Sequence, residues 1–261
     1  MRCALAVLGI SYDSNEAFKM AEKVTRVMYE NAFSSSIEIA KEKGPFPLVK
    51  DSIWADKKEK PRNVALLTFP PSSSNAVICE TTFGVEPYFA LAYEQNVMEG
   101  MRLKTVVPLL VEKLKERGIY SEDLISKIIA NHGSIQGISE VPEDLKKVFK
   151  VAHDLNWRDH IKMQAAFQKW TDNAITKTIN MPMDTTPNDI KEAYIMAWKL
   201  GCKGLTVYRD HTKKDQVFEF GNGSVAKSGI AAKMCPNCDI PLKRDKKCLK
   251  CERCGFSTCE L

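Results

Sequence analysis

Apolar positions recur at helical spacing near the start of the chain. Asp13 can cap a helix together with Glu16 three residues later, and Gly44-Pro45 lies beyond its expected end. The apolar residues that share one face of this predicted helix are Ala17, Ala21, Val24 and Met28. The spacing therefore predicts a long amphipathic helix early in the sequence.

A continuous apolar run of strand length occupies residues 64–69 and gives way to Pro70-Pro71-Ser72-Ser73-Ser74-Asn75. This order predicts a strand, a small-residue loop and the start of a helix. Such a loop exposes backbone N–H groups at the positive end of a helix dipole, where a phosphate is stabilised. Ser72, Ser73 and Ser74 would add hydroxyl donors, although an ordinary capped loop has the same composition.

Two later helices have clear boundaries. One is predicted from about Ser121 to near Gly133, with Leu124, Ile125, Ile128 and Ile129 facing inward. The other has Thr186 as its N-cap, Pro187 in the first position and Asp189 in the third, and Gly201 is its expected stop. Its inward positions are Ile190, Ala193, Tyr194 and Ala197. Because β-prone segments 175–180 and 204–208 flank it, we expect a strand–helix–strand unit with parallel strands.

Helix and strand signals alternate over roughly 215 residues, which favours an α/β architecture. From Glu219 the pattern gives way to glycine, serine and asparagine, a composition typical of a flexible linker. We therefore expect a large domain over residues 1–218, a linker over 219–233 and a small cysteine-rich module over 234–261.

Composition and charge exclude several classes of protein. A hydrophobic content of 44% can fill a real core. The sequence has no apolar run long enough for a membrane span and no convincing signal peptide, so we expect a cytoplasmic protein without a membrane partner. Much of the net charge of +5 lies between Lys227 and Arg253, so it does not indicate specific nucleic-acid binding.

Cysteines crowd the tail at positions 235, 238, 248, 251, 254 and 259. Two Cys-x-x-Cys knuckles, Cys235 with Cys238 and Cys251 with Cys254, are separated by twelve residues, and together they predict a closed tetrahedral zinc site. Metal binding would then supply the folding free energy that so short a segment lacks. The alternative is a set of free or disulfide-forming thiols without metal.

Isolated polar residues elsewhere give weaker signals. His132 and His160 stand in no metal-spaced or nucleophile-paired motif, so we expect structural roles for both. We expect Cys202 to behave as a buried small apolar residue. Asn180 is compatible either with the mouth of a barrel or with a polar strand end.

Several stretches of the chain, in the same order, resemble the ribonucleotide reductases. Residues 62–93 are similar to a family signature in which a hydroxyl-rich loop before a helix holds the substrate's phosphates and a Glu-Pro pair follows. Pro71, Ser72, Ser73 and Ser74 match that loop, although the cobalamin-dependent branch usually has glycine where Ser73 stands. The stretches that resemble this branch are 131–137, 159–168, 171–182 and 201–210. Thr206-Val207 replaces the tyrosine pair of the oxygen-dependent branch.

The resemblance implies the second half of a ten-stranded α/β barrel followed by a zinc-ribbon-like module. It implies adenosylcobalamin as cofactor, a ribonucleotide substrate and thiyl-radical chemistry that makes deoxyribonucleotides. It also implies a tethered tail whose thiols reduce an active-site disulfide and are regenerated by a thioredoxin-like protein. We expect Cys248 and Cys259 to be that redox pair, with zinc on the remaining four tail cysteines.

The radical cysteine of the family, within Asn-x-Cys-x-Glu, does not occur in this sequence, so we expect no catalytic residue here. Residues 1–10 resemble the middle of a family motif. We expect an N-terminal half supplied by a partner chain, with a truncated reading frame or a non-catalytic remnant as alternatives. The rival function is a zinc-ribbon binding module on a degenerate barrel. An oxygen-dependent reductase is a rival within the enzyme class.

Overall fold

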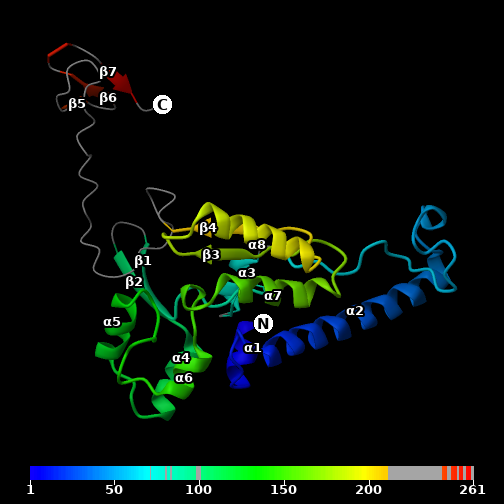
Figure 1. Cartoon of the computed structure of the whole chain (residues 1–261), viewed down its shortest axis with the longest axis horizontal. Coiled ribbons are helices and arrows are strands. Elements are labelled where there is room, and N and C mark those ends of the chain that lie inside the picture. The colour runs from blue at the N-terminus through cyan, green and yellow to red at the C-terminus, as the bar shows by residue number, and fades with distance from the viewer. Residues whose placement is uncertain are drawn as a thin grey trace. The chain divides into compact units, whose positions relative to one another are not determined.

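The computed structural model describes residues 1–70, 72–79, 81–82, 84–97, 101–210, 243–245, 248–251, 253–254 and 257–259. The chain divides into two compact units, Met1–Gly221 and Asn222–Leu261, and each is described by itself. The helices of the first unit are α1 (Arg2–Val7), α2 (Asn15–Lys43), η1 (Val49–Asp51), α3 (Ser73–Ile78), α4 (Pro108–Glu116), α5 (Glu122–Ala130), α6 (Glu143–Val148), η3 (Ala152–Asp154), α7 (Trp157–Gln168) and α8 (Pro187–Lys199). Its strands are β1 (Ala92–Val97), β2 (Met101–Val106), β3 (Thr178–Met181) and β4 (Thr206–Arg209) (Figure 1).

The predicted strand–helix–strand unit is confirmed. β3 and β4 pair in parallel, from Thr178 opposite Thr206 to Met181 opposite Arg209, and α8 connects them. Thr186 and Asp189 form the predicted capping box, and Gly201 follows the helix with a positive φ of 76°. Ala193 and Ala197 face the core as expected, whereas Tyr194 is 51% exposed.

The helix predicted from Ser121 is also confirmed. The Ser121 hydroxyl oxygen accepts a hydrogen bond from the Leu124 N–H at 3.1 Å. The four residues predicted to face inward, Leu124, Ile125, Ile128 and Ile129, are all buried. The helix ends at Ala130, shortly before Gly133.

The first long helix differs in detail from its prediction. Its N-cap is Ser14, whose hydroxyl accepts from the Ala17 N–H at 3.0 Å, because Asp13 is engaged in an ion pair with Lys150. Val24 and Met28 are 38% and 45% exposed rather than buried. The buried positions of α2 are Ala17, Ala21, Thr25 and Ser36.

Residues 64–69 do not form the predicted strand. They make one isolated parallel bridge, Phe69 with Ile175, because the Asp172 carboxylate accepts the Leu66 and Leu67 N–H groups at 2.7 and 3.3 Å. Those donors are therefore occupied by a side chain instead of a strand ladder. The predicted helix after the serine loop is the short α3.

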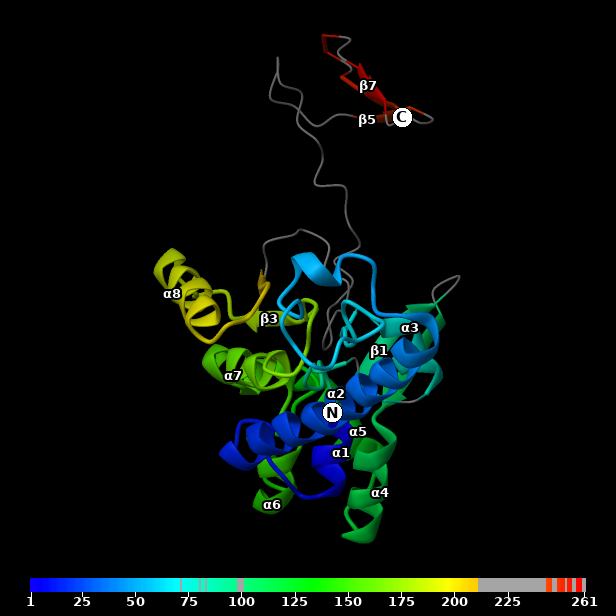
Figure 2. The ribbon, with the colours of Figure 1, turned by 90° about the vertical axis from the view of Figure 1, so that its right-hand side faces the viewer.

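Three apolar clusters stabilise the first unit. One joins the start of β1 to α4, α5 and α6, a second joins α1, α2 and α7, and a third joins α7, β3 and α8. Helix α7 thus lies between α2 and α8 (Figure 2). Among the described residues, no helix combines the length and the apolar character needed to cross a membrane.

Candidate functional site

A cavity of about 270 Å³ opens where α1, α3, the segment after α3 and the end of β2 meet. Six of the side chains that line it are Cys3, Ala76, Thr81, Tyr88, Phe89 and Tyr93. Its walls therefore combine aromatic rings and hydroxyl groups with one thiol.

The thiol of Cys3, on α1, is half-buried and surrounded by hydroxyl groups. The Thr81 and Tyr88 hydroxyls donate to its sulfur at 3.4 and 3.5 Å, and the Cys3 Sγ lies 4.0 Å from the Thr82 Oγ1. Burial raises the pKa of Cys3, but these hydrogen bonds outweigh it, so the pKa lies below its ordinary value of 9.0. A thiol with a lowered pKa is a stronger candidate for nucleophilic or redox chemistry than an ordinary cysteine.

A fully buried lysine lies behind the aromatic wall of the cavity. The Lys177 ammonium donates to the Glu86 Oε2 at 3.1 Å, the His160 Nδ1 at 2.8 Å and the Thr178 carbonyl at 2.9 Å. Glu86 also accepts from the Thr178 N–H at 2.7 Å. We call Lys177, Glu86 and His160 the lysine hub. Because Glu86 precedes Pro87 and Tyr88, the hub ties the cavity wall to the start of β3.

His160 has the structural role expected from the sequence. Since its Nδ1 accepts from Lys177, its Nε2 carries the proton and donates to the Ala152 carbonyl at 3.1 Å. Ala152 in turn donates from its N–H to the Tyr88 carbonyl at 2.7 Å. Burial, followed by the charge of Lys177, lowers the pKa of His160 to about 3, so the imidazole is neutral.

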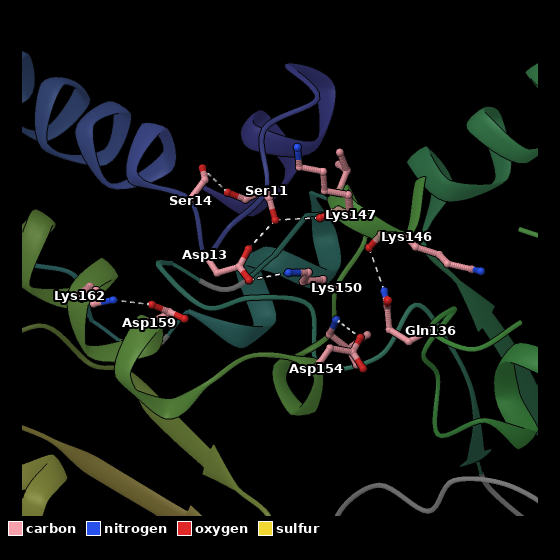
Figure 3. A network of polar contacts seen from close by, with 12 residues as sticks. Ser11, Asp13, Ser14, Gln136, Lys146, Lys147, Lys150, Asp154, Asp159 and Lys162 are labelled. Carbon is pink, nitrogen blue, oxygen red and sulfur yellow. Dashed lines mark hydrogen bonds and ion pairs between the residues drawn. The ribbon is translucent and has the colours of Figure 1, made fainter. Parts of the chain in front are cut away.

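A polar network anchors the segment between α1 and α2 to residues 146–154 (Figure 3). Ser11 donates to the Lys147 carbonyl at 2.8 Å, and the Lys150 ammonium lies 2.5 Å from the Asp13 carboxylate. On the same segment, the Asp154 carboxylate accepts the Val151 N–H at 2.8 Å. These contacts fix the position of α1, and therefore of Cys3, against the rest of the unit.

The back of the cavity wall is closed by Gly133, which has a φ of 73°. A Cβ atom at this position would lie 2.4 Å from the Ala90 Cβ and 2.9 Å from the Ala92 carbonyl oxygen. Glycine is required here because both the backbone conformation and the close approach exclude a side chain.

The predicted phosphate loop lies beside this cavity. Ser72 is half-buried, and its carbonyl accepts a hydrogen bond from the Ala76 N–H at 3.0 Å. This hydrogen bond starts α3, and Ala76 of that helix lines the cavity. Pro71 lies outside the described residues, and only the backbone of Ser73 and Ser74 is described, as the first turn of α3.

The tail forms a three-stranded antiparallel sheet of β5 (Lys243–Asp245), β6 (Cys248–Lys250) and β7 (Ser257–Cys259). Its register sets Cys248 directly opposite Cys259. Cys251 and Cys254 lie on the connection between β6 and β7, where Cys251 is fully buried and Cys254 is exposed. Cys235 and Cys238 lie outside the described residues. Among the residues that the structure describes, no group of three or more metal-ligating side chains comes together.

Comparison with protein families decides the relationship. The family model for the ribonucleotide reductase barrel domain matches residues 1–64 and 57–208. The chain belongs to the ribonucleotide reductase family. Vitamin B12-dependent ribonucleoside-diphosphate reductases from Thermoplasma acidophilum and Mycobacterium tuberculosis are 39% and 35% identical to it, over 85% and 83% of the chain.

The chain spans 29% and 30% of the length of these two reductases. Among solved structures, the class Id ribonucleotide reductase α subunit of Actinobacillus ureae matches with a TM-score of 0.68 and 24% identity, and the match covers 80% of this chain and 37% of that one. This likeness shows the barrel-domain fold of the reductases.

The sequence gives no local signal for Cys3, because no motif spacing surrounds it and its hydroxyl partners follow 78 and 85 residues later. The Glu-Pro signature was a usable signal, because Glu86 and Pro87 lead directly into Tyr88. Cys202 is half-buried beside the α8 cluster, and burial raises its pKa to about 11.

Proposed function

We propose that this chain supplies the reducing side of the active site of a vitamin B12-dependent ribonucleoside-diphosphate reductase, which makes deoxyribonucleotides for DNA synthesis. The observation that carries the proposal is the Cys3 thiol, which lies in a cavity next to α3 and has a lowered pKa. The curated names of the relatives support the diphosphate substrate and the cobalamin dependence.

The serine loop is the proposed binding site for the substrate's phosphates. Pro71, Ser72, Ser73 and Ser74 lead into α3, and Ala76 of that helix lines the cavity. A phosphate bound at this loop would place the rest of the nucleotide toward the aromatic and hydroxyl-lined walls. The cobalamin-dependent branch usually has glycine where this chain has Ser73, and any side chain at that position limits how closely a phosphate can approach the backbone.

The cysteine tail is the proposed electron carrier. In this role, a thiolate of the Cys248–Cys259 pair attacks an active-site disulfide, which forms a mixed disulfide and releases one active-site thiolate. The second tail thiolate then attacks the tail sulfur of the mixed disulfide, so that the other active-site cysteine leaves as a thiolate and the tail becomes the disulfide. The opposite placement of the two residues on β6 and β7 supports this pairing. A thioredoxin-like protein would then reduce the tail disulfide.

Zinc is proposed on Cys235, Cys238, Cys251 and Cys254. The burial of Cys251 and the position of its knuckle between two antiparallel strands fit a structural metal site. If the tail binds no metal, its six cysteines should be alkylated at comparable rates. Metal analysis of the purified protein, with Cys251→Ser as the disrupted variant and Cys79→Ser as the control, tests this part.

Adenosylcobalamin does not fit the cavity described above, because about 270 Å³ cannot enclose a corrin ring. We propose that the corrin is held with the help of an N-terminal half-barrel on a partner chain, which also contributes the radical cysteine, and that the complete enzyme works in the cytoplasm.

Reconstitution tests the proposal. The chain is mixed with a candidate N-terminal half, adenosylcobalamin, a ribonucleoside diphosphate and dithiothreitol, and deoxyribonucleotide is measured. We expect turnover that is lost in Cys3→Ser and retained in Cys202→Ser. A non-catalytic zinc-ribbon module would give no product in either case.

The role of the tail is tested by changing the reductant. A Cys248→Ser/Cys259→Ser double variant should lose turnover supported by thioredoxin and keep turnover supported by dithiothreitol, which can reach the cavity directly. Equal losses with both reductants would contradict the shuttle role.

A further inference from the structure

The Cys3 sulfur has an unusual set of hydrogen-bonding neighbours. A neutral thiol is a weak acceptor and offers one weak donor. Here two hydroxyl groups, those of Thr81 and Tyr88, donate to the same sulfur, and the thiol itself donates to the Thr82 Oγ1 at 4.0 Å. Convergent donors favour the charged form of the acceptor, which for cysteine is the thiolate.

The second observation is a buried cation without an anionic partner. Arg2 is fully buried and donates from Nη2 to the carbonyl groups of Val148 and Lys150, but its Nε and Nη1 have no partner among the described residues. The nearby carboxylate of Asp13 is paired with Lys150. An unpaired buried charge is costly unless an opposite charge lies close by.

Arg2 reaches Cys3 through Tyr88. The Arg2 guanidinium carbon lies 5.3 Å from the centre of the Tyr88 ring, and the hydroxyl of that ring contacts the Cys3 sulfur. Burial, above all, raises the pKa of Tyr88 well above its ordinary value, so its hydroxyl keeps the proton that it donates to the Cys3 sulfur. A thiolate at Cys3 would supply the negative charge that Arg2 lacks.

We propose that Thr81, Tyr88 and Arg2 form a thiolate cradle, which keeps Cys3 ionised in the cavity so that it can attack a disulfide. In this step, which runs in the opposite direction to the exchange proposed for the tail thiols, the Cys3 sulfur forms a new S–S bond with one sulfur of an incoming disulfide. The original S–S bond breaks, and its other sulfur leaves as a thiolate, so no further oxidant or reductant is needed. The inference rests on the proposed function and deepens it by naming the residues that set the reactivity of the thiol.

A further charged group among the described residues faces the thiol. The Met1 ammonium donates to the Gly84 carbonyl at 3.3 Å and interacts electrostatically with Cys3, while burial lowers its own pKa. The proposal therefore needs a control in which this charge is moved, namely a chain that carries a short Gly-Ser extension before Met1.

The test measures the rate of iodoacetamide alkylation of Cys3 against pH in the full chain, with the modified peptide quantified by mass spectrometry. We expect the midpoint of the profile to rise by about one pH unit or more in Tyr88→Phe and in Thr81→Val, because each removes one donor. Arg2→Met should move it in the same direction. Thr105→Val, which removes another hydroxyl from the cavity wall, should leave it unchanged.

Thr81 is exposed, so its valine variant tests the cradle even if the Arg2 variant does not fold. A midpoint that stays in place in both Thr81→Val and Tyr88→Phe overturns the cradle, as does a shift caused by the Gly-Ser extension alone. The measurement needs no cobalamin, nucleotide or partner, so a failed reconstitution and a failed cradle are distinguishable.

Discussion

Cys3 and Cys202 are both half-buried in the same unit, yet the pKa values of their thiols are shifted in opposite directions. Burial raises the pKa of Cys202 to about 11, and the pKa of Cys3 is lowered although burial acts against it. The difference is the surroundings: apolar residues of the α8 cluster around Cys202, and hydroxyl groups around Cys3. Donor placement, and not depth, therefore sets the direction in which the pKa of each of these two thiols is shifted.

The largest effect is expected from Lys177→Met, which removes the hub behind the wall that carries Tyr88. Loss of one partner of a buried ion pair costs about 3–5 kcal/mol of unfolding free energy. We also expect the Cys3 alkylation profile to move toward that of Cys202. Denaturant unfolding measures the first effect. Lys146→Met, which breaks a pair with the 86% exposed Glu143, is the control and should cost less than about 1 kcal/mol.

The second-largest effect is expected from Gly133→Ala, which would push against Ala90 of the cavity wall. The new Cβ would lie 2.4 Å from the Ala90 Cβ in a left-handed backbone conformation, so we expect a loss of roughly 2–4 kcal/mol. Gly137→Ala, with a similar φ and nothing within 4 Å, should cost only about 1 kcal/mol. Equal losses of unfolding free energy in the two variants would show that the close approach at Gly133 does not affect stability.

The neutral His160 predicts how stability depends on pH. Its pKa is lowered to about 3 in the folded protein from an ordinary 6.5, so below pH 6.5 the unfolded chain binds a proton that the folded chain does not. Stability should fall by about 1.4 kcal/mol per pH unit as the pH drops through this window. His160→Gln should flatten that slope. An unchanged slope would show that other groups cause the acid sensitivity.

The smallest loss of stability is expected from a change in α8, the helix whose cluster packs against Cys202. Thr186→Ala removes the N-cap of α8 and should cost about 1 kcal/mol, while the Cys3 profile stays in place. Thermal unfolding and Cys3 alkylation measure the two quantities. Asn188→Ala on the same first turn is the control, with an expected loss of only a few tenths of a kcal/mol. A shift at Cys3 in either variant would mean that the two cysteines are not independent.

Local sequence signals predicted the parts of the fold that local contacts determine. The cap at Thr186 and the inward face of α5 depend on neighbours within one or two helical turns. The failures depend on distant side chains: Asp172 takes the backbone donors of residues 66–67, and Lys150 engages Asp13 away from the cap of α2.

The candidate site divides in the same way. The serine loop and the cysteine knuckles stay predictions, which the sequence offers because their residues are adjacent or regularly spaced. The thiolate cradle joins Cys3 to Thr81 and Tyr88 across 78 and 85 residues, and no spacing rule predicts such contacts. The lysine hub likewise joins Glu86 to Lys177 across the unit.

The most direct test compares the two cysteines in one sample of the unmodified chain. Cys3 and Cys202 are alkylated with iodoacetamide between pH 6 and 10, and each rate is read from its own peptide by mass spectrometry. Because the pKa values lie below 9.0 and at about 11, we expect Cys3 to react at least about a hundredfold faster near neutral pH. Equal rates, or a faster Cys202, would contradict the account.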